Sequence, residues 1–87
     1  MPIPRFCDLA PDTDELTAYD RRHLTTYLTL LDAAAEGADW REVVQVLFGI
    51  DAAQEPRRAQ LVHDSHLARA HWMTECGYRH LVRSAHH

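Results

Sequence analysis

The chain has 87 residues and a net charge of −4, and all nine of its fixed cations are arginines. Hydrophobic residues make up 46% of the sequence, which suits one small folded domain and argues against a disordered segment. No run of about 18 apolar residues is present, and the first residues lack the apolar stretch of a secretory signal. The composition therefore predicts a cytoplasmic location.

The first helix is expected over residues 17–37, TAYDRRHLTTYLTLLDAAAEG. Thr17 and Asp20 have the spacing of a capping box, and Gly37 is a typical stop signal. Apolar side chains recur between them at helical spacing, so one face of this helix is predicted to enter a core. That predicted face contains Leu24, Tyr27, Leu28, Leu31 and Ala35.

A second, shorter helix is predicted in DWREVVQVLFG, with Asp39 as N-cap and Gly49 as the closing residue. A third helix is expected to begin near Pro56, because proline suits the first helical position. The connection between the two helices, residues 49–55, is longer than the three or four residues of a common helix-turn-helix. The sequence therefore predicts an extended turn.

Two neighbouring stripes of the third helix are predicted to face inward. One contains Leu61, Ser65, Ala68 and Trp72, and the other contains Ala59, Val62, His66, Ala70 and Met73. Gly77 is expected to end the helix, with Tyr78, Leu81 and Val82 in a short final turn.

The predicted fold class is all-α, a three-helix helix-turn-helix variant with an extended turn between helices two and three and a short C-terminal helical turn. Residues 1–16 are expected to form an extended N-terminal segment. Residues 17–83 are expected to form the single domain, and residues 84–87 a tail.

Catalysis and cofactor binding are not expected. Asp64, Ser65 and His66 are the residue types of a hydrolase triad, but consecutive helical residues point about 100° apart and cannot form that hydrogen-bonded chain. The chain has seven histidines and two cysteines, yet it has no CxxC pair and no HExxH motif. We therefore expect no metal and no cofactor.

The distribution of charge along the chain is the main basis for choosing between DNA binding and protein binding. Residues 1–56 carry four arginines and eleven acidic residues, which disfavours contact with phosphate. Arg57, Arg58 and Gln60 lie in the first turn of the third helix, where a recognition helix would read bases. Asp51, Glu55 and Asp64 lie close to them and would repel phosphate. DNA binding is therefore expected to be unlikely.

Protein docking is the other possibility. Leu67 is predicted to lie on the polar, solvent-facing arc of the third helix, where an apolar side chain could anchor a contact. The predicted partner-binding residues are Asp64, Leu67, His71, Tyr78 and Arg79.

The segments LTAYDRRHLTTYLTLLDAAAEGADWREV, LFGID and DSHLARAHWMTECGYRHL resemble a family of proteobacterial regulators of conjugative elements. These are the RovC-like DNA-binding domains, an extended-turn helix-turn-helix variant, and the resemblance covers roughly residues 8–82. It implies two kinds of member. Longer activators use a cationic face for DNA, and short stand-alone antiactivators mimic the helix-turn-helix domain of an activator and occupy its N-terminal domain.

The acidic first part of the chain and the absence of lysine match the second kind of member. The expected function is therefore that of an antiactivator that blocks an activator of conjugative-element excision and transfer. Its expected partner is the N-terminal domain of that activator, and no small-molecule ligand or membrane is expected. The alternative is a small DNA-binding transcriptional repressor that uses the third helix through Arg57, Arg58 and Gln60.

Overall fold

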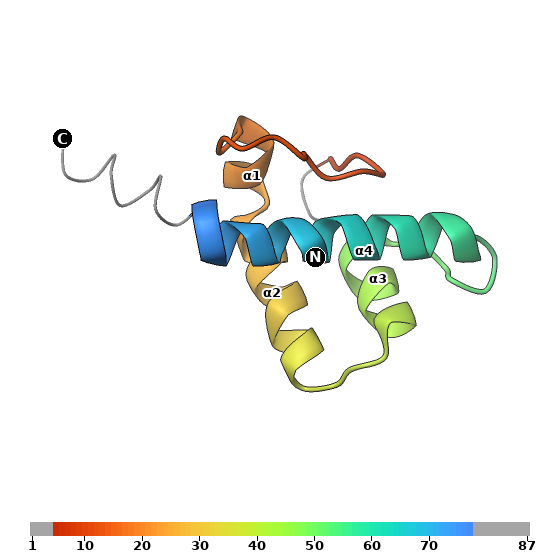
Figure 1. Ribbon diagram of the computed structural model, residues 1–87. Coiled ribbons are helices and arrows are strands. Elements are labelled where there is room, and N and C mark those ends of the chain that lie inside the picture. The colour runs from red at the N-terminus through yellow and green to blue at the C-terminus, as the bar shows by residue number, and fades with distance from the viewer. Residues whose placement is uncertain (1–4, 78–87) are drawn as a thin grey trace, which may run out of the picture.

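The computed structural model describes residues 5–77, which contain four α-helices, a closing π-helical turn and no strand (Figure 1). The elements are α1 (Ala18–Arg22), α2 (Leu24–Ala35), α3 (Trp40–Phe48), α4 (Pro56–Trp72) and η1 (Met73–Gly77). The prediction of a small all-helical, helix-turn-helix-like domain is confirmed. No helix within the described residues is both long and apolar enough to cross a membrane.

The first predicted helix is divided into α1 and α2 at His23. Thr17 caps α1 through the expected box, since its side chain accepts from the backbone N–H of Asp20 while the Asp20 carboxylate accepts from the backbone N–H of Thr17. His23 leaves helical geometry with φ −107° and ψ 18°, and its buried ring lies 3.1 Å from the carbonyl oxygen of Arg5 through Nε2. A contact with a distant part of the chain therefore holds the residue at which the helix bends.

The inward face of α2 differs from the predicted one. Tyr27 and Leu30 are buried, whereas Leu24 and Leu28 are exposed. The hydroxyl of Tyr27 donates to the buried Asp20 carboxylate at 2.8 Å, and this bond fixes the side of α2 that faces α4. The prediction for Tyr27 is confirmed, and the predictions for Leu24 and Leu28 are wrong because a polar contact sets the rotation of the helix.

Helix α3 and the turn that follows it agree closely with the sequence. Asp39 accepts the backbone N–H of Arg41 at 3.1 Å, and Gly49 adopts the left-handed conformation that ends many helices. Residues 49–55 then connect α3 to Pro56, so the extended turn is confirmed. Ile50 is buried within this turn and joins the core between the helices.

Helix α4 is the central element, with α2 and α3 on one side and the N-terminal segment on the other (Figure 1). The predicted stripe of Ala59, Val62, His66, Ala70 and Met73 is buried. The neighbouring stripe is only partly covered, because Leu61 and Ala68 are exposed and Ser65 and Trp72 are half-buried. The inward face of α4 is therefore narrower than predicted. The final turn expected at Tyr78, Leu81 and Val82 lies outside the described residues.

The N-terminal segment, residues 5–16, lies along α4 and is held by several contacts. The backbone N–H of Ala10 donates to Ser65 Oγ at 3.1 Å, and Ser65 Oγ donates to the carbonyl of Asp8 at 3.2 Å. The ring of Phe6 packs edge-on against Phe48, with 4.9 Å between ring centroids. This segment covers one flank of α4 and leaves another flank open to solvent.

Candidate nucleic-acid interface

Most of the exposed side chains of α4 share one arc of the helix, placed by the 100° rotation between successive residues. Core side chains occupy one flank of this arc, and the N-terminal segment covers the other. We call this arc the α4 surface; its members are Arg57, Gln60, Leu61, Asp64, Ala68 and His71. The surface includes residues from both of the predicted sites, so the DNA-binding and partner-binding predictions concern overlapping regions of the molecule. Tyr78 and Arg79 lie outside the described residues.

Arg57 and Arg58 are adjacent in sequence but have different surroundings. Arg58 donates from Nε to Asp8 Oδ1 at 3.0 Å and lies 3.4 Å from Glu55 Oε1 through Nη1. Arg57 is exposed and forms no ion pair with any residue from 5 to 77. The first turn of α4 therefore offers one unengaged guanidinium and one that is held by the N-terminal segment. This difference could not be predicted from local sequence patterns, because Asp8 is 50 residues away from Arg58.

Leu67 does not have the exposure that the sequence predicted. It is half-buried and packs against the cluster that contains Val44, Phe48 and Val62. At 100° per residue it lies between the core side of α4 and the exposed arc, next to α3. The expectation of an exposed apolar anchor is therefore wrong at this position. Leu61, which is 46% exposed, is the large apolar side chain on the α4 surface.

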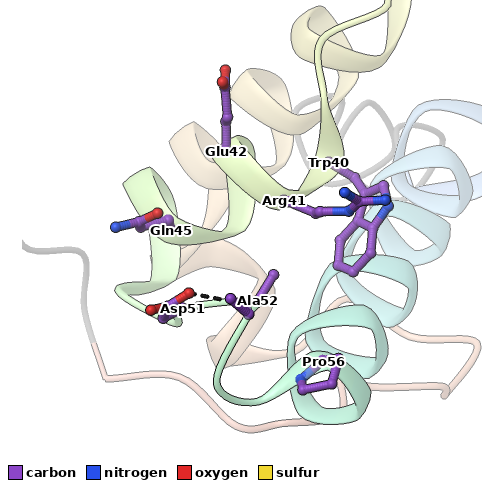
Figure 2. Close-up of a pocket in the computed structure, with 8 residues that line it drawn as sticks. Trp40, Arg41, Glu42, Gln45, Asp51, Ala52 and Pro56 are labelled. Atoms are coloured by element: carbon purple, nitrogen blue, oxygen red, sulfur yellow. Dashed lines mark hydrogen bonds between the residues drawn. The ribbon is translucent and has the colours of Figure 1, made fainter.

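The extended turn is held by its own hydrogen bonds. Asp51 Oδ1 accepts the backbone N–H of Ala53 at 2.9 Å (Figure 2). The Asp51 carbonyl accepts the N–H groups of Gln54 and Glu55. Ala52 is buried and anchors the middle of the turn. The turn therefore holds the beginning of α4 in a defined position relative to α3.

An open pocket lies between α3, the turn and the beginning of α4. In Figure 2, Arg41 lies beside the ring of Trp40, and Glu42 and Gln45 extend from the same helix. The guanidinium carbon of Arg41 is 5.9 Å from the centroid of the Trp40 ring. Arg41 adds a second cation near the first turn of α4, while Glu42 and Asp51 keep the pocket mixed in charge.

The three acids that argued against DNA contact all have partners. Asp51 caps the turn, and Glu55 lies within 3.4 Å of Arg58. Asp64 Oδ1 lies 3.0 Å from Nδ1 of His63, whose side chain is 13% exposed. These contacts direct each carboxylate to a neighbour within the fold. Of these contacts, only the one between Glu55 and Arg58 pairs the acid with a fixed cation, and the exposed carboxylates of Asp51 and Asp64 would still repel a nearby phosphate.

A buried ion pair that the sequence analysis missed fixes α4 against α1. Arg69 donates from Nη2 to Asp20 Oδ2 at 2.7 Å and from Nε to Asp20 Oδ1 at 3.0 Å. The same guanidinium donates to the carbonyls of Thr13 and Glu15 at 2.6 and 2.8 Å. One side chain thus joins α4, α1 and the N-terminal segment. Arg69 is consequently not available to a phosphate.

The environment of Asp20 explains how a carboxylate is tolerated in the interior. Burial alone would raise the pKa of Asp20. Hydrogen bonds to the charged form, from Arg69, Thr17 and Tyr27, outweigh burial and lower the pKa to about 2. The pair is therefore ionised at neutral pH. No signal in the sequence separates Asp20 and Arg69 from the exposed charges around them.

His66 is fully buried and has hydrogen-bond partners on both ring nitrogens, as expected of a structural histidine. Its Nδ1 lies 2.7 Å from the carbonyl of Val62, so Nδ1 carries the proton, and Nε2 accepts from the hydroxyl of Tyr19 at 2.6 Å. That hydroxyl also accepts the backbone N–H of Cys7 at 3.0 Å. Burial lowers the pKa of His66 below its ordinary value. Within the described residues, no group of three or more His, Cys, Asp or Glu side chains could hold a metal.

The fold and this surface define a small helix-turn-helix-like domain with an extended turn. The sequence matches, over residues 5–83, the RovC DNA-binding-domain family, which is described as "T6SS, Transcription factor, DNA binding domain". The chain belongs to this family. No curated protein shows significant similarity to it.

Family membership corrects one expectation. The acidic net charge predicted that DNA binding is unlikely, but the family to which the chain belongs is a family of DNA-binding domains of transcription factors. Net charge was a poor guide because it does not say where the charges lie, and the exposed Arg57 at the start of α4 forms no ion pair with any residue from 5 to 77. The relation to stand-alone antiactivators and to conjugative elements is not part of this match.

Proposed function

We propose that this protein regulates transcription by binding duplex DNA through the first half of the α4 surface. The main support is the exposure of Arg57 and Gln60 at the start of a helix that follows a hydrogen-bonded extended turn. Arginine pairs with the O6 and N7 atoms of guanine, and glutamine pairs with the N6 and N7 atoms of adenine. Both side chains stand on the N-terminal end of the helix, where recognition helices contact base edges.

Two further features support contact at this end of α4. Glu55, the N-cap residue, makes no side-chain hydrogen bond to the helix, so the first-turn amides are not capped by a side chain. These amides and the positive end of the helix dipole favour a phosphate there. Arg41 lies across the adjacent pocket, on α3, and can approach the backbone of the same duplex.

The second half of the α4 surface is less suited to DNA. Asp64 is anionic, and His71 is followed by Glu75, which is also exposed. Because α4 rises 1.5 Å per residue, His71 lies roughly 20 Å along the helix from Arg57. We therefore assign the DNA contact to residues 57–61 and exclude Asp64 and the C-terminal end of α4 from it.

The direct test is to follow backbone amide signals by NMR while a short duplex of mixed sequence is added. The proposal expects the largest shifts at Arg57, Gln60 and Arg41, with little change at His71. Shifts confined to the C-terminal end of α4, or none at millimolar duplex, would contradict it. That second result would instead favour an antiactivator, whose predicted contacts are Asp64, Leu67 and His71 together with Tyr78 and Arg79.

A further inference from the structure

The N-terminal segment contacts the first turn of α4 through Asp8 and Phe6. Asp8 lies beside Arg58, with 3.0 Å between Asp8 Oδ1 and Arg58 Nε. The guanidinium carbon of Arg58 also lies 5.9 Å from the centroid of the Phe6 ring. An acid from a distant part of the chain therefore holds a cation that neighbours the proposed DNA contact of Arg57.

The Asp8 carboxylate lies where it would compete with a DNA phosphate for the Arg58 guanidinium. Arg58 is the third residue of α4, at the positive end of the helix, where an anion is stabilised. The carboxylate of Asp8 provides such an anion within the molecule. The side chains of Arg58 and Asp8 are 42% and 50% exposed, so a DNA phosphate can reach the same guanidinium.

We propose that Asp8 is an autoinhibitory latch on the DNA-binding surface. In the free protein the Asp8 carboxylate occupies Arg58, and on duplex DNA a phosphate takes the place of that carboxylate. This inference rests on the proposed function. It adds that the N-terminal segment sets the affinity of the surface, because the latch must open before Arg58 can contribute.

Release of the latch does not require release of the segment. Ala10 and Ser65 share a hydrogen bond, and Arg69 binds the carbonyls of Thr13 and Glu15. Phe6 also packs on Phe48 independently of the Asp8 carboxylate. Neutralising Asp8 should therefore release Arg58 from the N-terminal segment, with Glu55 as its remaining acidic neighbour, and leave the segment in place.

The test compares Asp8→Asn with Asp12→Asn in duplex DNA binding, measured by fluorescence anisotropy over a range of salt concentrations. Both variants remove one negative charge from the same segment, but Asp12 is exposed and forms no ion pair with any described residue. We expect Asp8→Asn to bind roughly three- to fivefold more tightly, with a salt slope close to that of the unchanged protein, because Arg58 meets a phosphate in both complexes. Asp12→Asn should change affinity less and keep the slope.

The Arg58→Ala background completes the experiment, since the latch acts through Arg58. There, Asp8→Asn and Asp12→Asn should have equal effects. If the two variants are already equal in the otherwise unchanged protein, or if Asp8→Asn keeps its advantage without Arg58, the latch is refuted. Hydrogen exchange at the Ala10 amide supplies a structural check. Loss of its protection in Asp8→Asn would also refute the latch, because Asp8 would then be an anchor of the segment.

Failure of the latch and failure of the proposed function give different results. If DNA binding requires Arg57 but Asp8→Asn and Asp12→Asn bind DNA equally well, only the latch is refuted. If DNA binding does not depend on Arg57, the proposed DNA contact on the α4 surface is refuted, whatever the effect of Asp8→Asn.

Discussion

Arg69 of α4 and Asp20 of α1 form an ion pair in the interior, with 2.7 Å between Nη2 and Oδ2, and neither residue is more than 4% exposed. The pair connects residues 49 positions apart and fixes the direction of α4 relative to α1. Through the same guanidinium, α4 is also joined to the carbonyls of Thr13 and Glu15 in the N-terminal segment.

Asp20→Asn should destabilise the protein by about 3–5 kcal/mol, because the Arg69 guanidinium would stay buried without a counterion. Urea unfolding followed by circular dichroism measures the change. Asp32→Asn, on an exposed part of α2, is the matched control and should have little effect. Equal stabilities for the two variants would show that the buried pair does not organise the fold.

The Asp20–Arg69 pair also predicts that the free energy of unfolding falls in acid. The pKa of Asp20 is about 2 in the folded state, against an ordinary value of 3.8. Its contribution is therefore present above pH of about 4 and is lost as the pH falls through about 2. The free energy of unfolding should fall more steeply over this window in the unchanged protein than in Asp20→Asn.

The burial of His66 predicts a second loss of folding stability, at a milder acidity than the loss that follows from Asp20. Burial lowers its pKa in the folded state, so the unfolded state binds the proton more readily. Stability should be full above an ordinary histidine pKa of about 6.5 and should fall as the pH drops below it. His23 is also buried with a lowered pKa and should add to the effect.

Unfolding free energies at pH 7.5 and 5.5 measure this dependence. His66→Gln should reduce the difference between the two pH values, whereas His71→Gln, on the exposed arc, should leave it unchanged. An undiminished difference in His66→Gln would assign the acid sensitivity to other groups.

Leu67 and Leu61 should respond differently to a charge. Leu67→Asp places a carboxylate against the core cluster and should destabilise the protein by about 1–3 kcal/mol. Leu61→Asp, on the exposed arc, should be nearly neutral. Thermal unfolding of the two variants checks the assignment, and similar melting temperatures would contradict the burial of Leu67. A binding defect in Leu67→Asp alone is consequently not evidence for an interface.

Local signals predicted much of this fold. The capping box at Thr17, the N-cap at Asp39, Gly49 and Pro56 all act within a few residues of themselves, so they mark element boundaries reliably. The extended turn follows directly from the distance between the last two of them.

The rotation of the helices could not be predicted in the same way. The side of α2 that faces inward depends on the hydrogen bond from Tyr27 to Asp20, and the open arc of α4 depends on the N-terminal segment. The distinction between Arg57 and Arg58 depends on Asp8. Each of these contacts joins different segments of the chain, so local sequence patterns do not predict it. The net charge does not reveal these contacts either.

The affinity of Arg57→Ala for duplex DNA across salt concentrations is the most direct test of whether the first turn of α4 binds DNA. Arg21→Ala is the matched control, since Arg21 is an exposed arginine on α1, beside the far end of α4. We expect Arg57→Ala to bind roughly tenfold more weakly, with a salt slope shallower by about one if the contact is to phosphate, and Arg21→Ala to bind nearly as the unchanged protein does. Equal affinities for the two variants, or no salt-dependent binding by the unchanged protein, would contradict it.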